Sequence, residues 1–300
     1  MNVFERSSDK KFKLMKKQRI EIEKLYKEWA DEIGKLANFY SNKTNASAPL
    51  MERYYRELKT QITKTSKEVS IETQKTIKRN VYLISDAVVE DNVKWLSSLG
   101  FDSKRVKMAF SYVPQHSIYR LFEGKIYKGG FNLSSRIWSD NQRTLNDIYN
   151  IVAKGLAEQK PIEKMARDLK RYVNPKVMFD WNLKANDGVR IYKRKVDYNA
   201  QRLARTLTQH AYQISVEEVT EDNPFIKEYV WVSNGSRVCD ICKARDGEHF
   251  KKGEVPLDHP NGMCSIEPVV VKDISKQLKR WFESPDGTFK DIDKFAKNFK

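Results

Sequence analysis

The chain has 300 residues, of which 40% are apolar and 32% charged, with 14 Phe, 14 Tyr and 6 Trp, and its formal net charge at pH 7 is +16. This mixture is too aromatic for a disordered chain, and no run approaches the roughly 18 apolar residues of a membrane span. The basic excess favours a polyanionic partner, with nucleic acid ahead of an anionic membrane; a lysine-rich solvated surface is the simpler alternative.

The first part of the chain has the periodicity of long helices. Between residues 22 and 40 the apolar residues recur at steps of three and four, which predicts a helix with one packing face. The stretch SNKTNASAP at residues 41–49 predicts a break. A second helical region is expected from Met51 to Leu99, with or without an internal break, and Gly100 can close it. We assign residues 1–125 to an N-terminal long-helix region.

Shorter elements are expected next, in a helical domain at residues 126–222. Pro114 should end a segment rich in Phe and Tyr. Helical spacing returns at residues 145–156, and a further helix is expected that has Pro161 in its first turn and is stopped by Asn174-Pro175. A loop is expected from Val177 to Lys195, because Asn186-Asp187-Gly188 is a turn signal. The next helix, at residues 200–214, carries a narrow face of small and apolar residues.

The period changes after Asn223-Pro224. The runs IKEYVWVS at 226–233 and SIEPVVV at 265–271 are rich in β-branched and aromatic residues and predict two strands. We assign residues 223–272 to a small zinc-binding β module and 273–300 to a helical tail with a helix from about Ile274. The predicted fold class is α+β, a predominantly helical body with a small zinc-stabilised β module near the C-terminus.

All three cysteines of the chain lie in this module, at Cys239-x2-Cys242 and, after 16 residues, His259-x4-Cys264. Residues 1–17 lack the apolar segment of a secretion signal, so we expect a reducing compartment, where clustered cysteines hold metal more often than disulfides. Three sulfurs and one imidazole nitrogen form a closed tetrahedral set that suits structural Zn²⁺. Such a metal would supply much of the folding free energy of a small module.

Other assignments of these residues stay open. The cysteines could be ordinary small apolar residues and His259 a loop histidine. His249 could replace His259 as a ligand, although Pro260 and Asn261-Gly262 form a turn that leads from His259 to Cys264. His210, beside an apolar helical face, is interpreted as a packed or capped histidine.

Motifs in this region resemble those of the phage head-morphogenesis, or minor capsid, proteins related to the F protein of phage Mu. The similar elements are Trp231, Arg237-Val238-Cys239-Asp240-Ile241-Cys242, Asp246-Gly247, His259-Pro260-Asn261 and, upstream, Ala204-Arg205-Thr206. The likeness covers about residues 130–271. It departs from the family at Gly262, where the family often has the first cysteine of Cys-x-Cys.

The resemblance implies a low-copy structural protein of a tailed phage and no enzyme. Such a protein would be made in the host cytoplasm and reside in the virion, inside the capsid near the portal vertex. It would act in head assembly and in DNA packaging or ejection, with the portal protein, other head proteins and double-stranded DNA as partners and no membrane partner.

The basic charge independently fits sequence-independent contact with phosphate. For each candidate residue a solvated surface charge is the alternative. The candidates are Lys164, Arg167, Lys170, Arg171, Arg190, Lys193, Arg194 and Lys195.

Two other functions share some of these features. In an HNH-like nuclease, Asp258-His259 would bind metal and activate water, but no histidine follows His259 to complete such a site. A cellular zinc-ribbon protein that binds nucleic acid would share both the metal site and the charge. Arg205 has no expected role beyond supporting the β module through an ion pair.

Overall fold

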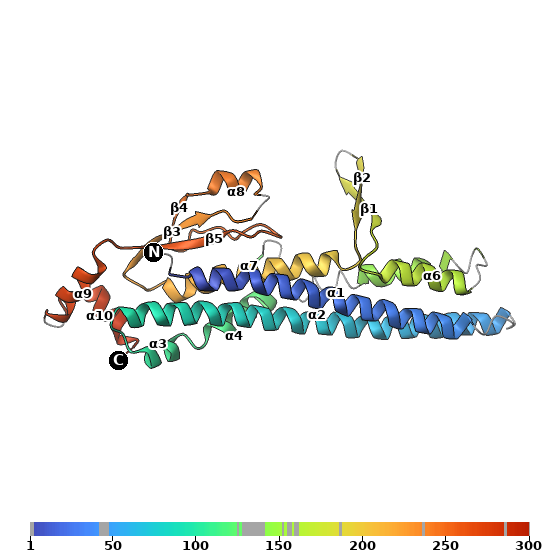
Figure 1. The fold of residues 1–300 in the computed structure, drawn as a ribbon, viewed down its shortest axis with the longest axis horizontal. Coiled ribbons are helices and arrows are strands. Elements are labelled where there is room, and N and C mark those ends of the chain that lie inside the picture. The colour runs from blue at the N-terminus through green and yellow to red at the C-terminus, as the bar shows by residue number, and fades with distance from the viewer. Residues whose placement is uncertain are drawn as a thin grey trace. The chain divides into compact units, whose positions relative to one another are not determined.

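The computed structural model describes residues 3–41, 48–124, 126–127, 142–151, 153–154, 158, 162–185, 188–235, 238–284 and 287–299. Helices dominate it, and its strands form a two-stranded hairpin and a three-stranded antiparallel sheet near the C-terminus (Figure 1). The predicted α+β class, with a helical body and a small C-terminal β module, is confirmed.

The chain divides into two compact units, and both combine segments that are far apart in sequence. The first unit comprises Met1–Lys16, Lys78–Gly130 and Leu203–Lys300, and the second comprises Lys17–Ile77 and Phe131–Arg202. The predicted domain boundaries at residues 125, 222 and 272 stay predictions.

Two long helices, α1 (Glu5–Ser41) and α2 (Ala48–Ser98), contribute to both units. The second is continuous, and it ends where the sequence predicts. Gly100 has a φ of 97°, and Phe101 N–H donates to the carbonyl of Leu96 at 3.2 Å, which closes the last turn of α2. Most of the predicted break at 41–49 lies outside the described residues, since only Ser41 and residues 48–49 belong to helices.

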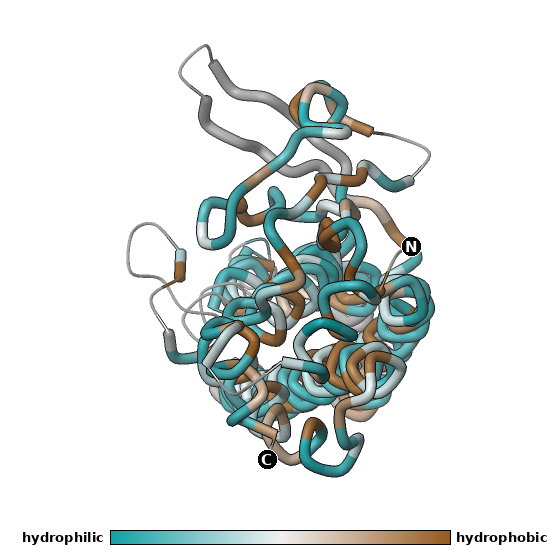
Figure 2. Tube along the Cα trace, turned by 90° about the vertical axis from the view of Figure 1, so that its left-hand side faces the viewer, coloured by the Kyte–Doolittle hydropathy of each residue, from teal (hydrophilic) through white to brown (hydrophobic). Residues whose placement is uncertain are grey.

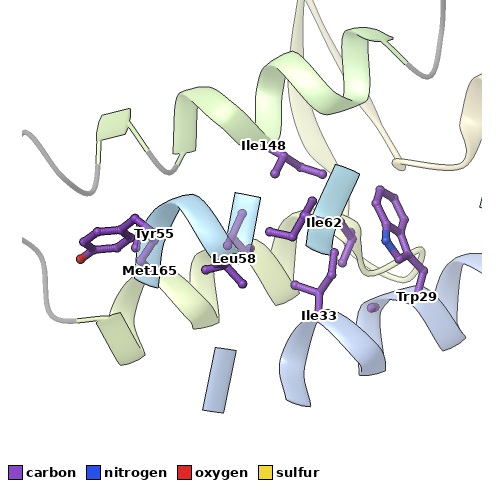
Figure 3. Packing of buried hydrophobic residues seen from close by; sticks show 10 residues of the cluster. Trp29, Ile33, Tyr55, Leu58, Ile62, Ile148 and Met165 are labelled. Atoms are coloured by element: carbon purple, nitrogen blue, oxygen red, sulfur yellow. The ribbon is translucent and has the colours of Figure 1, made fainter. Parts of the chain in front are cut away.

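The core of the second unit confirms the packing face expected for α1. Trp29 and Ile33 of α1 meet Leu58 and Ile62 of α2, beside helical residues 142–151 and α6 (Ile162–Val173) (Figure 3). Trp29 Nε1 also donates to Thr65 Oγ1 at 2.9 Å, so the indole is buried with its polar atom satisfied. Figure 2 shows that both hydrophobic and hydrophilic residues occur along the helices. The buried cluster consists of Trp29, Ala30, Ile33, Tyr55, Leu58, Ile62, Ile148, Met165, Leu169 and Val173.

The loop predicted from Val177 to Lys195 is wrong, because most of this segment is a β-hairpin. Strand β1 (Phe179–Ala185) pairs antiparallel with β2 (Gly188–Arg194), and the register places Trp181 opposite Tyr192. Cross-strand pairs of aromatic and β-branched residues stabilise two-stranded ribbons of this kind. The many charged residues of this segment obscure the alternation of apolar and polar residues by which a strand is recognised in a sequence. Asn186 and Asp187 of the predicted turn lie outside the described residues.

The sheet of the first unit confirms both predicted strands and adds a third. Strand β3 (Ile226–Val232) is central, between β4 (His249–Lys251) and β5 (Ser265–Val270). Strand β4 has only three residues, too few for a periodic pattern to reveal it. Pro268 is tolerated in β5 because that strand is an edge of the sheet.

The first unit contains further helices besides the sheet and the end of α2. They are α3 (Ser103–Ala109), α4 (Val113–Phe122), α7 (Tyr198–Thr220, from Leu203 on), α8 (Asp240–Arg245), α9 (Ile274–Phe282) and α10 (Lys290–Lys297). Pro114, expected to end a segment, instead lies in the first turn of α4, where its missing N–H needs no partner. No helix among the described residues has a stretch long and apolar enough to cross a membrane.

Candidate metal centre

The structure places the four predicted metal ligands around the turn that opens α8 and the loop that precedes β5. Cys239 is the N-cap of α8, and Cys242 lies in the first turn of that helix. His259 and Cys264 lie in the loop before β5, with four residues between them. Ligand atoms of Cys239, Cys242 and His259 all lie within 4.8 Å of one another, and those of Cys242, Asp258 and Cys264 do the same. Cys242 belongs to both groups and joins them into one cluster that could hold a metal ion.

The geometry fits a tetrahedral ion with sulfur and nitrogen ligands. The sulfur of Cys239 and Nε2 of His259 are 3.3 Å apart. Two such ligands on tetrahedral zinc would be separated by about 3.5 Å, given typical bond lengths. Cys242 N–H points at the Cys239 sulfur from 3.5 Å, the arrangement expected of a Cys-x2-Cys turn. Small shifts of side chains would therefore complete the coordination.

The imidazole of His259 is oriented for binding through Nε2. Its Nδ1 lies 3.1 Å from the carbonyl oxygen of Pro260, so Nδ1–H can donate there and leave Nε2 free for a metal. His249 is placed elsewhere, because its Nδ1 pairs with Glu228 Oε1 at 2.8 Å across strands β4 and β3. His259 is therefore the histidine of the cluster.

The ionisable groups of the cluster influence one another. The Cys242 N–H, aided by His259, holds the pKa of the Cys239 thiol below its usual value. Burial and the neighbouring Cys264 and Cys239 raise the pKa of Cys242. Burial alone would lower the pKa of His259, but the Pro260 carbonyl and the charges of Asp258 and Cys239 outweigh it and raise the pKa. A metal ion would therefore displace a tightly held proton from Cys242.

Asp258, which sequence reasoning considered only as a possible catalytic acid, organises the loop. Its carboxylate is buried and accepts the N–H groups of His259 at 2.8 Å and Cys264 at 3.0 Å. A Cβ atom at Gly262 would overlap this carboxylate. Glycine at 262, the departure from the family pattern, therefore leaves the space in which Asp258 lies.

Helix α7 also contacts the loop between His259 and Cys264. The Thr206 hydroxyl accepts the N–H of Asn261 at 2.8 Å, and Arg205 Nη1 donates to Asn261 Oδ1 at 2.7 Å. Asn261 has a φ of 71°, a left-handed conformation that needs support in a residue with a side chain. Arg205 thus supports the β module through a hydrogen bond to an amide, and the ion pair expected for it is absent among the described residues.

Further along α7, three polar side chains continue this contact. Gln209 donates to the carbonyl of Cys264, and His210 Nε2 donates to the carbonyl of Asp258 at 2.8 Å. Gln213 donates to the carbonyl of Pro256 at 2.7 Å and accepts Asp258 N–H at 3.2 Å. Sequence reasoning saw only the apolar stripe of this helix. A run of Thr, Gln and His at helical spacing within it was the available signal for a buried polar face.

Lys11 of α1 is a contributor that no sequence pattern indicated. Its side chain is fully buried, and Nζ donates to the carbonyl of Cys264 at 2.9 Å, 253 positions away in the sequence. Burial lowers the pKa of this ammonium to about 7, against the raising effects of Asp258 and Cys264. An amphipathic helix rich in surface lysines gives no sign of which lysine is buried.

The cluster opens into a cavity of about 380 Å³. Arg205 and Asn234 line it together with the four candidate ligands, and Cys239 is exposed. An ion in the cluster could therefore be reached by chelators from solvent.

The candidate phosphate-binding residues lie in the second unit. Lys164, Arg167, Lys170 and Arg171 are exposed on α6, and their helix buries Met165, Leu169 and Val173 on another face. Arg194 and Lys195 are partly buried at the end of the hairpin. Arg190 and Lys193 are in β2, but their side chains lie outside the described residues.

Comparison with known proteins found no protein family, no curated protein and no solved structure that matches this chain. The resemblance to Mu F-like proteins stays an expectation that rests on sequence motifs, foremost Ala204-Arg205-Thr206, Cys239-x2-Cys242 and His259-x4-Cys264.

Proposed function

We propose that this protein is a minor capsid or head-morphogenesis protein of a tailed phage, located inside the capsid near the portal vertex. It acts in head assembly and in DNA packaging or ejection, with the portal protein and other head proteins as partners. The observation that carries the proposal is the contact between two family motifs, since Arg205 and Thr206 bind Asn261. Motif residues that are 55 positions apart in the sequence and in contact in the structure are expected to belong to one structural unit.

The metal of this centre is zinc, and it is held by Cys239, Cys242, His259 and Cys264. Three thiolates and an imidazole favour a tetrahedral, redox-inert ion, and four protein ligands leave no open position for a substrate. The site is structural on this proposal. It joins the turn before α8 to the loop before β5.

The protein contacts double-stranded DNA without reading its sequence. The net charge of +16 and the exposed basic residues of α6 favour phosphate as the contact. A protein inside a filled head lies beside densely packed DNA, where sequence-independent attraction suffices.

A nuclease of the HNH type is less well supported. In such an enzyme the acid beside the histidine must be available to a metal-bound water, whereas both oxygens of Asp258 accept main-chain N–H groups. Cleavage of plasmid DNA with Mg²⁺ or Mn²⁺ that disappears in His259→Ala would favour the nuclease. A cellular zinc-ribbon protein that binds nucleic acid would share the metal site and the charge, and it would differ from the proposed protein only in residing in the cell instead of the virion.

Two measurements test the proposal. Elemental analysis of the purified chain should find one zinc ion per chain, and the Co²⁺-substituted protein should show the intense absorption of thiolate ligands and of tetrahedral cobalt. In protease-treated particles of the phage that encodes it, the chain should be protected until the heads are opened, at a few copies per particle. Its absence from both mature particles and procapsids would contradict the role in the head.

A further inference from the structure

The surroundings of Lys11 are unusual for a lysine. Its ammonium is fully buried, and its hydrogen-bond acceptors are the carbonyl of Cys264 at 2.9 Å, the Ser265 hydroxyl at 2.9 Å and the carbonyl of Met263 at 3.4 Å. The ring of Tyr212 lies under it, with its centroid 4.5 Å from Nζ. Among the described residues no carboxylate is within ion-pair distance of Nζ. A buried cation without a nearby anion is costly.

Metal binding would provide the missing negative charge. Three thiolates carry one more negative charge than a divalent ion neutralises, and Cys264 and Asp258 are the anionic groups that act on Lys11. The three acceptors on residues 263–265 match the three N–H donors of an ammonium. The environment of Lys11 is therefore complementary to a metal–thiolate centre rather than to neutral thiols.

The contact also connects the centre to the start of the chain. The hydroxyls of Ser8 and Ser265 lie 3.0 Å apart, one turn of α1 before Lys11. Near the first turn, Asp91 accepts from Ser7 N–H at 2.7 Å and from Arg6 Nε at 2.8 Å. The N-terminal segment, residues 3–16, is thus attached to α2 at one end and to the strand that follows Cys264 at the other.

We propose that Lys11 is a positioning residue of the metal centre, which fixes Cys264 through the main chain and couples metal occupancy to the docking of the N-terminal segment. This inference rests on the metal centre of the proposed function. The metal-loaded centre holds Lys11, and Lys11 holds the segment. Loss of the metal removes the excess negative charge of the three metal-bound thiolates from beside the buried ammonium and weakens that attachment.

The test compares the full chain loaded with Zn²⁺ and the same chain after chelation. Two quantities are measured: the hydrogen exchange of residues 3–16, and the zinc affinity, by competition with a chromophoric chelator. Lys11→Met removes the charge at nearly constant volume, and Lys13→Met makes the same change at an exposed position of the same helix. Lys11→Met should weaken zinc binding by about 10- to 100-fold, the range typical of outer-shell partners, while Lys13→Met should bind like the wild type.

Chelation of the wild type should increase exchange in residues 3–16, and in Lys11→Met this exchange should no longer respond to the metal. Equal zinc affinity in the two lysine variants, or N-terminal exchange in the wild type that ignores chelation, would overturn the inference. If Lys11→Met does not fold, the chelation experiment on the wild type decides alone. A wild-type chain that binds no metal would instead refute the metal centre itself.

Discussion

The main-chain N–H of Asn261 donates to the hydroxyl of Thr206 at 2.8 Å, although 55 positions separate the two residues. Arg205 binds the side chain of the same asparagine at 2.7 Å. A residue on a helix and a residue in a loop thereby fix the conformation between His259 and Cys264. The spacing of the two ligands is set by this contact as well as by the local chain.

Removing this contact should loosen the centre without unfolding the unit. We expect Thr206→Val, which deletes the acceptor of Asn261 N–H at constant shape, to reduce stability by about 1 kcal/mol, because a half-buried donor loses its partner. Zinc release to a chelator should become faster. Thr63→Val serves as the control, since Thr63 lies on α2 in the second unit. A Thr206→Val chain that releases zinc at the wild-type rate would contradict the positioning role.

Gly262→Ala should destabilise the metal loop, because the added Cβ overlaps the Asp258 carboxylate. Either that carboxylate must move away from its N–H donors, or the loop must shift; a cost of about 1–3 kcal/mol is expected. Gly253→Ala is the control. It has open space around its Cβ but a φ of 78°, so it should show only backbone strain of about 1 kcal/mol. Thermal unfolding and zinc content of both variants give the comparison.

Glu217 should make the stability depend on pH. Burial raises its pKa to about 7, against the opposing charge of Arg120. Because the folded state holds this proton more tightly than the unfolded state, the stabilisation is complete below about pH 4.5 and is lost as the pH rises through 7. Between pH 5 and 8 the wild type should lose up to about 3 kcal/mol relative to Glu217→Gln. Urea unfolding with a chelator present at each pH measures this, and parallel curves would contradict it. Glu32→Gln, at an exposed site, is the control.

The basic face of α6 should account for part of the salt dependence of DNA binding. Replacing Lys164, Arg167 and Arg171 by alanine should lower the slope of log K against log salt concentration by about 0.9 for each DNA phosphate that the variant no longer neutralises. The charge-matched control replaces the exposed Lys13, Lys16 and Lys17. The effect should be equal on unrelated DNA sequences. Identical slopes in both triple variants would remove α6 as the DNA-binding surface.

Much of the fold follows from local sequence patterns. The apolar stripe of α1, the closing glycine at 100 and the strands β3 and β5 all lie where periodicity and turn chemistry predict them. The hairpin β1–β2 was missed because its strands carry charges at positions where alternation would be sought. Strand β4 was also not predicted, because its three residues are too few to show an alternation of apolar and polar residues.

The sequence by itself determined the helical body, the two main strands and the set of cysteines and histidine that could hold a metal. Spacing along the chain is enough for these, because helices, strands and Cys-x2-Cys turns are built from neighbouring residues. Only the tertiary structure selected His259 over His249, made Asp258 a buried loop acceptor, and brought Arg205, Thr206 and Lys11 to the same loop. These contacts join residues distant in sequence, and packing, which no local pattern encodes, decides which polar groups are buried together.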